Sequence, residues 1–237
     1  MTTIQIDKMS ARERIARRCA QELKNGEVVN LGIGIPTLTA NYLPRGVEVI
    51  FHSENGIFGF AGKPQTGAAD SDITNAGCEP ITLIPGSAIM DLTTSLGAMR
   101  NGYIDVTILG GLEVDQQGNL ANWAVPREGK WWPGIGGAMD LCYGTKKVIA
   151  ALNHMDKQGN SKIRKACNLP LTGRGCVSVI VTDKAVFDIT ETGLILREVW
   201  QGVTVEDIAN WTDADFQVSP ELCEMDLNAG AEYAVAS

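Results

Sequence analysis

Histidine is almost absent from this chain. His52 and His154 are the only two in 237 residues, so a histidine-rich metal site is excluded. The six cysteines are scattered, and no two of them form a CxxC pair. That spacing is typical of reduced thiols in the cytoplasm rather than of a disulfide framework or a zinc site. A catalytic Cys–His pair stays open as an alternative, without a local signature around any of the cysteines.

The chain also lacks a long apolar run, including after Met1, so we expect neither a signal peptide nor a membrane span. Basic residues are scarce: 20 Lys and Arg stand against 28 Asp and Glu, for a net charge of -8. This balance excludes a general nucleic-acid binder, which needs a basic surface. One small anionic ligand can still be held by a local patch or by backbone N–H groups. We therefore expect a cytoplasmic protein that binds neither nucleic acid nor membrane.

What the sequence does have is the makeup of a globular α/β protein, with 44% hydrophobic and 20% charged residues. Its length suits one large domain or two small ones. A first helix is expected from a Ser10–Glu13 capping box to Asn25-Gly26, where the glycine ends it. Further helices are expected over 87–100, over 138–143 and from Thr204. Strands are expected over 28–31, 47–52, 81–84, 104–109, 148–152 and 177–181, with a hairpin formed by 187–189 and 194–196.

Alternating strands and helices predict one three-layer α/β domain over residues 1–225, with an open, mainly parallel sheet between flanking helices. We expect 226–237 to be a disordered tail. Two irregular stretches interrupt the pattern. Residues 59–72 are expected to form a surface loop or flap, and 115–137 are long enough to predict a functional loop.

The expected strand 47–52 stops abruptly in Ser53-Glu54-Asn55-Gly56. Serine, asparagine and glycine are turn residues, so Glu54 is presented on a sharp turn at the end of a mostly apolar strand. Ligands of open α/β sheets bind beyond the carboxyl ends of the strands. Glu54 could therefore act as a nucleophile or a base, and the alternative is a solvated acid on a turn.

A second candidate is the glycine pair Gly136-Gly137, which opens the expected helix at Ala138. Backbone N–H groups at such a place can stabilise a developing oxyanion. The alternative is a plain turn that enters a helix. A carboxylate on one turn and a pair of N–H donors on another together suggest acyl transfer. The earlier Gly32-Ile33-Gly34 lacks the further residues of a dinucleotide fingerprint or a P-loop, so a tight structural turn is the better interpretation there.

Several longer motifs occur in one order along the chain. They are Asn30-Leu31-Gly32-Ile33-Gly34-Ile35-Pro36-Thr37, Ser53-Glu54-Asn55-Gly56, Asn119-Leu120-Ala121-Asn122-Trp123, Gly136-Gly137-Ala138-Met139-Asp140-Leu141 and Leu169-Pro170-Leu171-Thr172-Gly173. In this the chain resembles the B (beta) subunit of 3-oxoacid CoA-transferases, the family of acetoacetate, butyrate–acetoacetate and 3-oxoadipate CoA-transferases. The resemblance runs from the first helix to about Ser219. It implies the CoA-transferase fold, which is similar to that of sugar-phosphate isomerases.

The resemblance also implies roles for the two candidates. Glu54 would attack an acyl-CoA thioester and carry CoA as a glutamyl-CoA thioester, and Gly136 and Gly137 would supply the oxyanion donors. CoA would be a co-substrate, and no metal or permanently bound cofactor would be needed. The chain would work with a separate A (alpha) subunit, as an A2B2 assembly, on an acyl-CoA and a carboxylic acid. Residues expected at the CoA are Asn55, Asn122, Ala138 and Met139.

Three departures from the family pattern leave the substrate pair open. His52 replaces a common glutamine, as in the 3-oxoadipate branch, and Arg100-Asn101-Gly102-Tyr103 replaces a common Arg-Gly-Gly-His. The segment 126–132, with Trp131 and Trp132, replaces a short Pro-Gly-Lys-Met type segment. We expect these two tryptophans and the 59–72 loop to keep water from the site. The alternatives are the beta subunit of a 3-oxoadipate CoA-transferase, a sugar-phosphate isomerase with Glu54 as base, and a non-catalytic sensor domain of the same fold.

Overall fold

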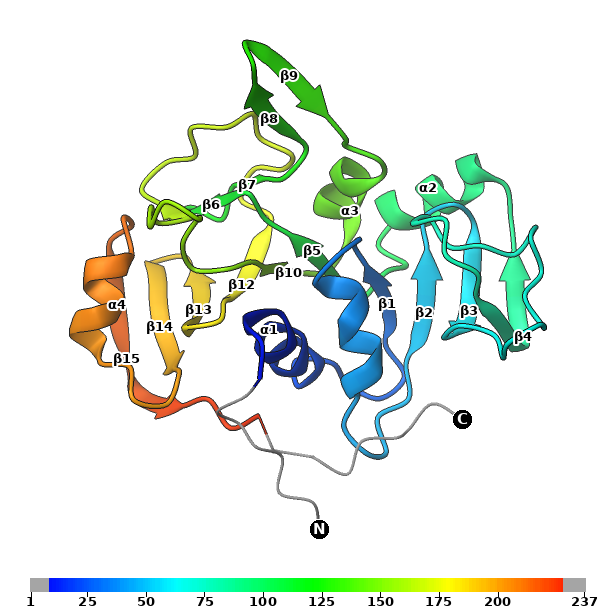
Figure 1. Ribbon diagram of the computed structural model, residues 1–237, viewed down its shortest axis with the longest axis horizontal. Coiled ribbons are helices and arrows are strands. Elements are labelled where there is room, and N and C mark those ends of the chain that lie inside the picture. Colours follow the sequence, from blue (N-terminus) through cyan, green and yellow to red (C-terminus); the bar gives the residue numbers. More distant parts are fainter. Residues whose placement is uncertain (1–8, 228–237) are drawn as a thin grey trace.

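The computed structural model describes residues 9–227, and its central feature is one ten-stranded sheet. The strands lie in the order β15-β14-β13-β12-β10-β5-β1-β2-β3-β4 (Figure 1). The five middle strands, from β12 to β2, all run parallel, as do β14 and β15. The antiparallel pairs join β12, β13 and β14 on one side and β2, β3 and β4 on the other. The bounds are β1 (Val28–Leu31), β2 (Ile50–Ser53), β3 (Ile57–Ala61), β4 (Thr82–Ile89), β5 (Val106–Gly110), β10 (Lys147–Ala151), β12 (Val177–Val181), β13 (Ala185–Thr190), β14 (Gly193–Val199) and β15 (Phe216–Glu224).

Helices and smaller strands cover both faces of this sheet. Helix α1 (Ala11–Ala20) and the 3-10 helix η2 (Pro36–Tyr42) pack together on one face (Figure 1). On the other face lie α2 (Leu92–Arg100), α3 (Ala138–Gly144) and α4 (Val205–Trp211), with a small sheet of β6 (Glu113–Asp115), β7 (Leu120–Ala121) and β11 (Ile163–Arg164). The hairpin of β8 (Ala124–Arg127) and β9 (Lys130–Pro133) projects beyond the sheet.

The core is divided by the sheet into two apolar clusters. Side chains alternate between the two faces of strand β10, so Val148 and Ala150 pack into one cluster and Ile149 and Ala151 into the other. A parallel strand buried on both faces needs such a continuous apolar run, which is what the sequence offers here. The prediction of a three-layer domain with a mainly parallel sheet is confirmed.

Several predicted elements match the structure closely. The strand over 28–31 and the strand over 177–181 have the predicted bounds, and the predicted hairpin is β13 and β14. Helix α4 begins after Thr204, whose hydroxyl and backbone N–H form a full capping box with Asp207. Helix α1 has only half of its predicted box, because Ser10 Oγ accepts from Glu13 N while the Glu13 carboxylate accepts from Arg17. This helix also ends at Ala20 rather than at Asn25-Gly26.

Other predicted elements are wrong. The helix expected over 87–100 begins only at Leu92, because Asp91 caps it by accepting from Thr94 N and the preceding residues complete β4. The first three residues of the loop expected over 59–72 belong to strand β3. The stretch 115–137, expected to be an irregular loop, contains the β8–β9 hairpin. This hairpin turns at Glu128 and Gly129, whose φ angles are +52° and +74°. Strand β15 was not predicted. Of the expected tail 226–237, Leu227 is buried, and residues 228–237 lie outside the described part of the chain.

A buried ion-pair network fastens α1 to the sheet. The Glu22 carboxylate accepts from Arg18 at 2.8 Å, from Lys147 of β10 at 2.6 Å and from Arg197 of β14. Arg18 also binds both carboxylate oxygens of Glu198 at 2.6 Å. Burial alone would raise the pKa of Glu22, but the charges of Arg18, Lys147 and Arg197 outweigh it and lower the pKa to about 2. The network therefore depends on an ionised Glu22.

Replacing Glu22 by glutamine should lower the free energy of unfolding by roughly 3 kcal/mol at pH 7, because Lys147 loses its one described carboxylate partner and the buried Arg18 loses one of two. The folded-state pKa of about 2 lies below the ordinary 4.5, so the stabilisation is complete above pH 4.5 and is lost as the pH falls toward 2. Urea unfolding of both proteins at several pH values measures it. The control is Asp215→Asn in the exposed Lys165–Asp215 pair, which should change stability by less than about 1 kcal/mol. Equal effects of the two substitutions would contradict this prediction.

Candidate active site

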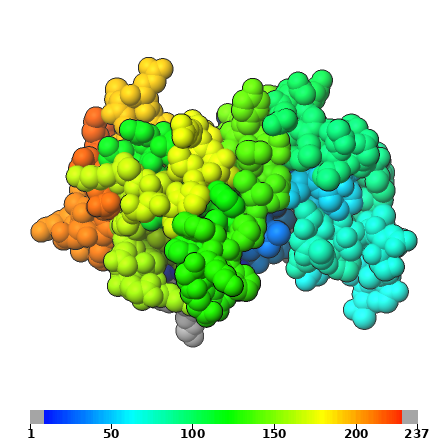
Figure 2. Space-filling view, turned by 90° about the horizontal axis from the view of Figure 1, so that it is seen from above, coloured from blue at the N-terminus to red at the C-terminus, as the bar shows by residue number. Residues whose placement is uncertain are grey.

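A large cavity reaches from the residues that precede β1 and β2, among them Gly26 and Glu48, to the edge of the sheet where the parallel strands end. It has a volume of about 2190 Å³, and the residues that follow β1, β2, β5 and β10 line it. Figure 2 looks down on this edge and shows the hollow between the green segment around β8 and β9 and the cyan segment around β3 and β4, with blue atoms at its floor. Since parallel strands place their carboxyl ends together, residues distant in sequence meet here. Among them are Gly32–Ile35, Glu54, Gly110, Gly111, Asn122, Gly136, Ala138 and Asn153.

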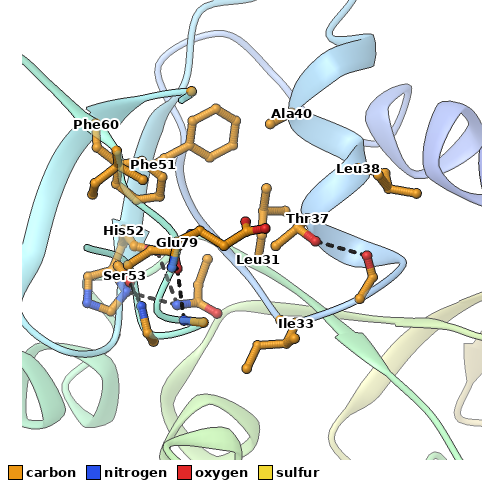
Figure 3. Close-up of a pocket in the computed structure, with 18 of the residues that line it drawn as sticks. Leu31, Ile33, Thr37, Leu38, Ala40, Phe51, His52, Ser53, Phe60 and Glu79 are labelled. Carbon is orange, nitrogen blue, oxygen red and sulfur yellow. Dashed lines mark hydrogen bonds between the residues drawn. The ribbon is translucent and has the colours of Figure 1, made fainter. Parts of the chain in front are cut away.

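The walls of the cavity are partly apolar. Figure 3 shows Phe51 and Phe60, from β2 and β3, on one side and Thr37 and Ala40 of η2 on the other. The Glu79 side chain enters the space between these walls. The 59–72 stretch contributes residues to the lining, and its expected role as a flap stays a prediction. Seven of the residues that line the cavity are charged, so the cleft can take a ligand that has both apolar and charged parts.

Glu54 lies on the turn between β2 and β3, and each residue of that turn is tied down. Ser53 Oγ accepts from Ala76 N at 2.9 Å, and the Glu54 carbonyl accepts from Ser95 Oγ at 2.9 Å. The Asn55 amide donates to Thr74 O at 2.8 Å. The backbone oxygen of Gly56 accepts from Met90 N at 2.8 Å. The turn is therefore a rigid platform for the Glu54 side chain.

Gly56 is the one residue of the turn that has to be glycine. Its φ angle is +115°, and a Cβ atom there would overlap the backbone oxygen of Met90. Glycine is therefore required at position 56, because the β2–β3 turn lies very close to the segment that enters α2.

The Glu54 carboxylate lies directly against the glycine pair that opens α3. A Cβ atom on Gly136 would stand 2.8 Å from Glu54 Oε1, and one on Gly137 would stand 2.7 Å from Glu54 Oε2. Within the part of the chain that the structure describes, neither glycine N–H donates a hydrogen bond to another protein group. The structure therefore brings together the carboxylate and the two backbone donors that the sequence pointed to separately.

The position of the glycine pair is set by its neighbours on both sides. Gly134 N donates to Trp123 O at 2.6 Å, which fixes the chain leaving the β8–β9 hairpin. Met99 of α2 reaches the other side, with its Cε 3.2 Å from the Cβ position of Gly137. Helices α2 and α3 are in contact, so the helix that holds Ser95 also supports the glycine pair.

Of the four residues expected at the CoA, two line the cavity and two do not. Asn122 and Ala138 line the cavity together with Glu54 and Gly136. The Asn55 side chain is engaged with Thr74, and Met139 is 49% exposed; neither belongs to the described residues that line the cavity. Trp131 and Trp132 are 54% and 58% exposed on the β8–β9 hairpin, so their expected role as a cover stays a prediction.

Two of the sequence motifs support each other beside the cavity. Asn122 N donates to Thr172 Oγ1 at 3.0 Å, and the same hydroxyl donates back to Asn122 Oδ1 at 2.6 Å. The Trp123 indole N–H donates to Leu171 O at 3.1 Å. The segment 169–173 therefore fixes the side chain of Asn122 and does not itself line the cavity.

Some residues at the site were missed by the sequence analysis. Lys162 lines the cavity and donates to Gly111 O at 2.7 Å, and burial lowers the pKa of its amine. Ser95 and Thr107 belong to a buried polar chain behind Glu54 that runs through His52 and Asn30. Asn30 carried a signal in the sequence, because it is a polar residue within an apolar parallel strand. For Lys162 and Ser95 we find no comparable signal.

Neither a metal cluster nor a membrane-spanning helix is found in residues 9–227. No group of three or more His, Cys, Asp or Glu side chains there could hold a metal ion. No helix of this region is long and apolar enough to cross a bilayer.

The chain is similar to known proteins over nearly its whole length. The family model described as Coenzyme A transferase matches residues 12–210. The B subunit of the probable succinyl-CoA:3-ketoacid coenzyme A transferase of Bacillus subtilis is 48% identical over 209 residues, which covers 88% of this chain and 96% of that protein. The beta subunit of the acetate CoA-transferase of Escherichia coli is 46% identical over 214 residues, which covers 90% of this chain and 97% of that protein.

A solved structure agrees with these relatives. An acyl-CoA transferase of Escherichia coli, in a thioester complex with CoA, matches with a TM-score of 0.74 and 25% sequence identity. The match covers 99% of this chain and 47% of that one, so this chain spans about half the length of that protein. Fold, sequence and the arrangement of the motifs agree, and the chain belongs to the coenzyme A transferase family.

Proposed function

We propose that this chain is the catalytic B (beta) subunit of a 3-oxoacid CoA-transferase, with Glu54 as the nucleophile. It moves CoA between a short-chain acyl-CoA and a carboxylic acid. The observation that carries the proposal is the contact of the Glu54 carboxylate with Gly136 and Gly137, beside the cavity that Glu54 and Gly136 line. The names of the relatives, which are beta subunits of succinyl-CoA:3-ketoacid and acetate CoA-transferases, support it.

The first step is attack of a Glu54 carboxylate oxygen on the thioester carbonyl carbon of the acyl-CoA. A C–O bond forms, the C–S bond breaks, and CoA leaves as a thiolate. The product is a mixed anhydride between the acyl group and Glu54. A carboxylate is suited to this step because the leaving thiolate and the attacking group exchange without a net change in protonation.

The second step is attack of the CoA thiolate on the side-chain carbonyl carbon of Glu54. The C–O bond of the anhydride breaks, the first carboxylic acid leaves, and a glutamyl-CoA thioester remains. The acceptor acid then runs both steps in reverse. Because a carboxylate replaces a carboxylate, the two half-reactions are nearly balanced in free energy. The first acid leaves before the second binds, so the kinetics are ping-pong.

Gly136 and Gly137 supply the electrostatic stabilisation. Each attack places negative charge on a carbonyl oxygen next to Glu54, and backbone donors aimed at that oxygen contribute about 3 kcal/mol each in comparable sites. Their N–H groups donate to no other described protein group, so they are available for this role. Water has to be excluded, because the anhydride and the thioester both hydrolyse.

CoA acts as a co-substrate and not as a permanently bound cofactor. We assign its thiol end to the neighbourhood of Asn55, Asn122, Ala138 and Met139. Asn122 and Ala138 line the cavity, which favours them. The thioester complex with CoA known for the Escherichia coli relative supports a CoA site on this fold.

The acyl groups are drawn from the acetoacetate-type 3-oxoacids, butyrate, acetate and succinate. The names of the relatives favour 3-ketoacid, succinyl or acetate pairs. The alternative is 3-oxoadipate, which His52 favours because that branch of the family tends to carry histidine at this position.

The partner is the A (alpha) subunit of the same CoA-transferase. Relatives of similar length are named as beta subunits, and the structural match spans about half of a longer chain, which supports a second half of similar size. We propose an A2B2 assembly in the cytoplasm, where the free thiols of all six cysteines would stay reduced.

Replacing Glu54 by glutamine should abolish CoA transfer and leave the fold intact, because it removes the nucleophilic anion from a turn held by other groups. The change in unfolding free energy should stay within about 1 kcal/mol. Intact mass after incubation of the chain and its alpha subunit with an acyl-CoA measures the adduct, which wild type forms and this variant does not. Glu79→Gln alters another carboxylate in the same cavity and should keep the adduct. A CoA adduct on the Glu54→Gln protein would contradict the assignment.

Replacing Gly137 by alanine should slow transfer by about a hundredfold, because the new Cβ would stand 2.7 Å from Glu54 Oε2 and displace the carboxylate. The φ angle of Gly137 is -86°, so alanine adds no backbone strain. Gly134→Ala is the matched control, since a Cβ at Gly134 meets nothing within 4 Å. Steady-state rates of the two variants test this prediction. Equal rates would show that the close contact between Glu54 and Gly137 is not needed for transfer.

The isolated chain should lack transferase activity and gain it when it is produced together with its alpha subunit. The reason is that a site at the junction of two subunits is closed to water only in the assembly. Light scattering of the co-purified complex measures its stoichiometry, and assays of both preparations measure the activity. Full activity of the chain alone would show that the partner is not needed for the site.

A further inference from the structure

A chain of buried polar groups runs through the sheet to the backbone of Glu54. Thr107 Oγ1 donates to Asn30 Oδ1 at 3.3 Å, and Asn30 Nδ2 lies 3.2 Å from His52 Nδ1. His52 Nε2 lies 3.0 Å from Ser95 Oγ, which donates to the carbonyl oxygen of Glu54 at 2.9 Å. The links thus join β5, β1, β2 and α2 to the catalytic turn, and Figure 3 shows the His52 ring below the cavity wall.

These groups have almost no contact with solvent. Thr107 and Ser95 are fully buried, His52 is 1% exposed and Asn30 is 3% exposed. A buried polar group is costly unless it is hydrogen-bonded, so four of them in one line need a reason for being there. Apolar residues at the same positions would fill the core without that cost.

The donors and acceptors fix the direction of every bond in the chain. Ser95 has one hydroxyl hydrogen, which goes to the Glu54 carbonyl, so its oxygen accepts from His52 Nε2–H. His52 Nδ1 is then the acceptor and receives an amide hydrogen of Asn30. This requires a neutral imidazole protonated on Nε2, and burial does lower the pKa of His52 to about 4.

The second histidine shows what a purely structural arrangement looks like. His154 is fully buried between Thr182 Oγ1 and Thr212 Oγ1, each 3.0 Å from a ring nitrogen, and burial lowers its pKa to about 4 as well. Its partners lie before β13 and after α4, and neither is among the described residues that line the cavity. The chain through His52 differs because it ends on the residue that carries the nucleophile.

We propose that His52 and Ser95 are positioning residues for Glu54, which hold its backbone carbonyl so that the carboxylate stays against Gly136 and Gly137. This inference rests on the proposed role of Glu54 as nucleophile. The Glu54 carbonyl fixes the peptide plane that follows Cα, and with it the direction in which the side chain leaves the turn. Helix α2 supplies both Ser95 and the Met99 side chain against Gly137, so one helix sets both sides of the contact.

The test uses the chain assembled with its alpha subunit and measures how fast the CoA adduct forms on Glu54 in a single turnover, by intact mass, with saturating acyl-CoA. His52→Leu removes the donor to Ser95, and His52→Gln keeps an N–H that can reach it. Ser95→Ala removes the donor to Glu54 with little change in volume. Thr212→Val is the matched control, because it breaks an equally long histidine–hydroxyl bond elsewhere.

His52→Leu and Ser95→Ala should slow adduct formation by about tenfold to a hundredfold, since a displacement near 1 Å has that effect on a positioned nucleophile. The KM for acyl-CoA, taken from steady-state rates, should change by less than about threefold, because the loss falls on the chemical step. His52→Gln should restore most of the rate. Thr212→Val should lower the melting temperature and leave the rate unchanged.

Wild-type rates in His52→Leu and Ser95→Ala would overturn the inference and leave the proposed function standing. The inference would also fail if His52→Gln were as slow as His52→Leu, because ring shape rather than the hydrogen bond would then matter. Absence of an adduct in wild type would instead overturn the proposed function. If His52→Leu does not fold, Ser95→Ala decides the question alone.

Discussion

The structure depends on one close contact, between the carboxylate of Glu54 and the backbone of Gly136 and Gly137. The distances of 2.7 and 2.8 Å from the carboxylate oxygens to the Cβ positions leave no room for a side chain on either glycine. A carboxylate and two glycines can lie this close together only if both turns are held rigidly. The hydrogen bonds of Ser53, Asn55 and Gly56 hold one turn, and the contacts of α3 with α2 hold the other. The proposed mechanism and the fold therefore share the same constraint.

The sheet supplies the rigidity that this contact needs. Its middle strands are parallel and buried on both faces, so their carboxyl ends form one firm edge beside the cavity. On the opposite side of the core, Glu22 and its three cations fix α1 to β10 and β14. The cavity itself lies where loops of different strands meet, and it is wide enough for a ligand much larger than a short acyl group. The proposed transfer of CoA through Glu54 needs this combination of a fixed carboxylate and a large, partly apolar cleft.

Polar groups in the core have two different uses in this protein. His154 and its threonine partners satisfy one another and stabilise the region around β12 and α4. His52, Asn30 and Ser95 form a line that ends at the backbone of Glu54, the proposed nucleophile. The two histidines are equally buried and both have a lowered pKa, so neither burial nor titration separates them. The two histidines differ only in the groups at the end of each chain of hydrogen bonds.

The sequence by itself determined the local structure: the strand at 28–31, the Thr204 capping box, the β13–β14 hairpin and the turn that presents Glu54. These elements depend on residues close to one another in sequence, whose side chains and φ preferences can be read from the sequence. It did not determine that 87–89 belong to β4 or that 124–133 form a hairpin, because strand pairing is decided by partners far along the chain. The meeting of Glu54 with Gly136 and Gly137, the support of Asn122 by Thr172, and the bond from Ser95 to Glu54 were likewise decided by the tertiary structure alone. The physical reason is that each joins two segments whose local patterns carry no information about their distance in space.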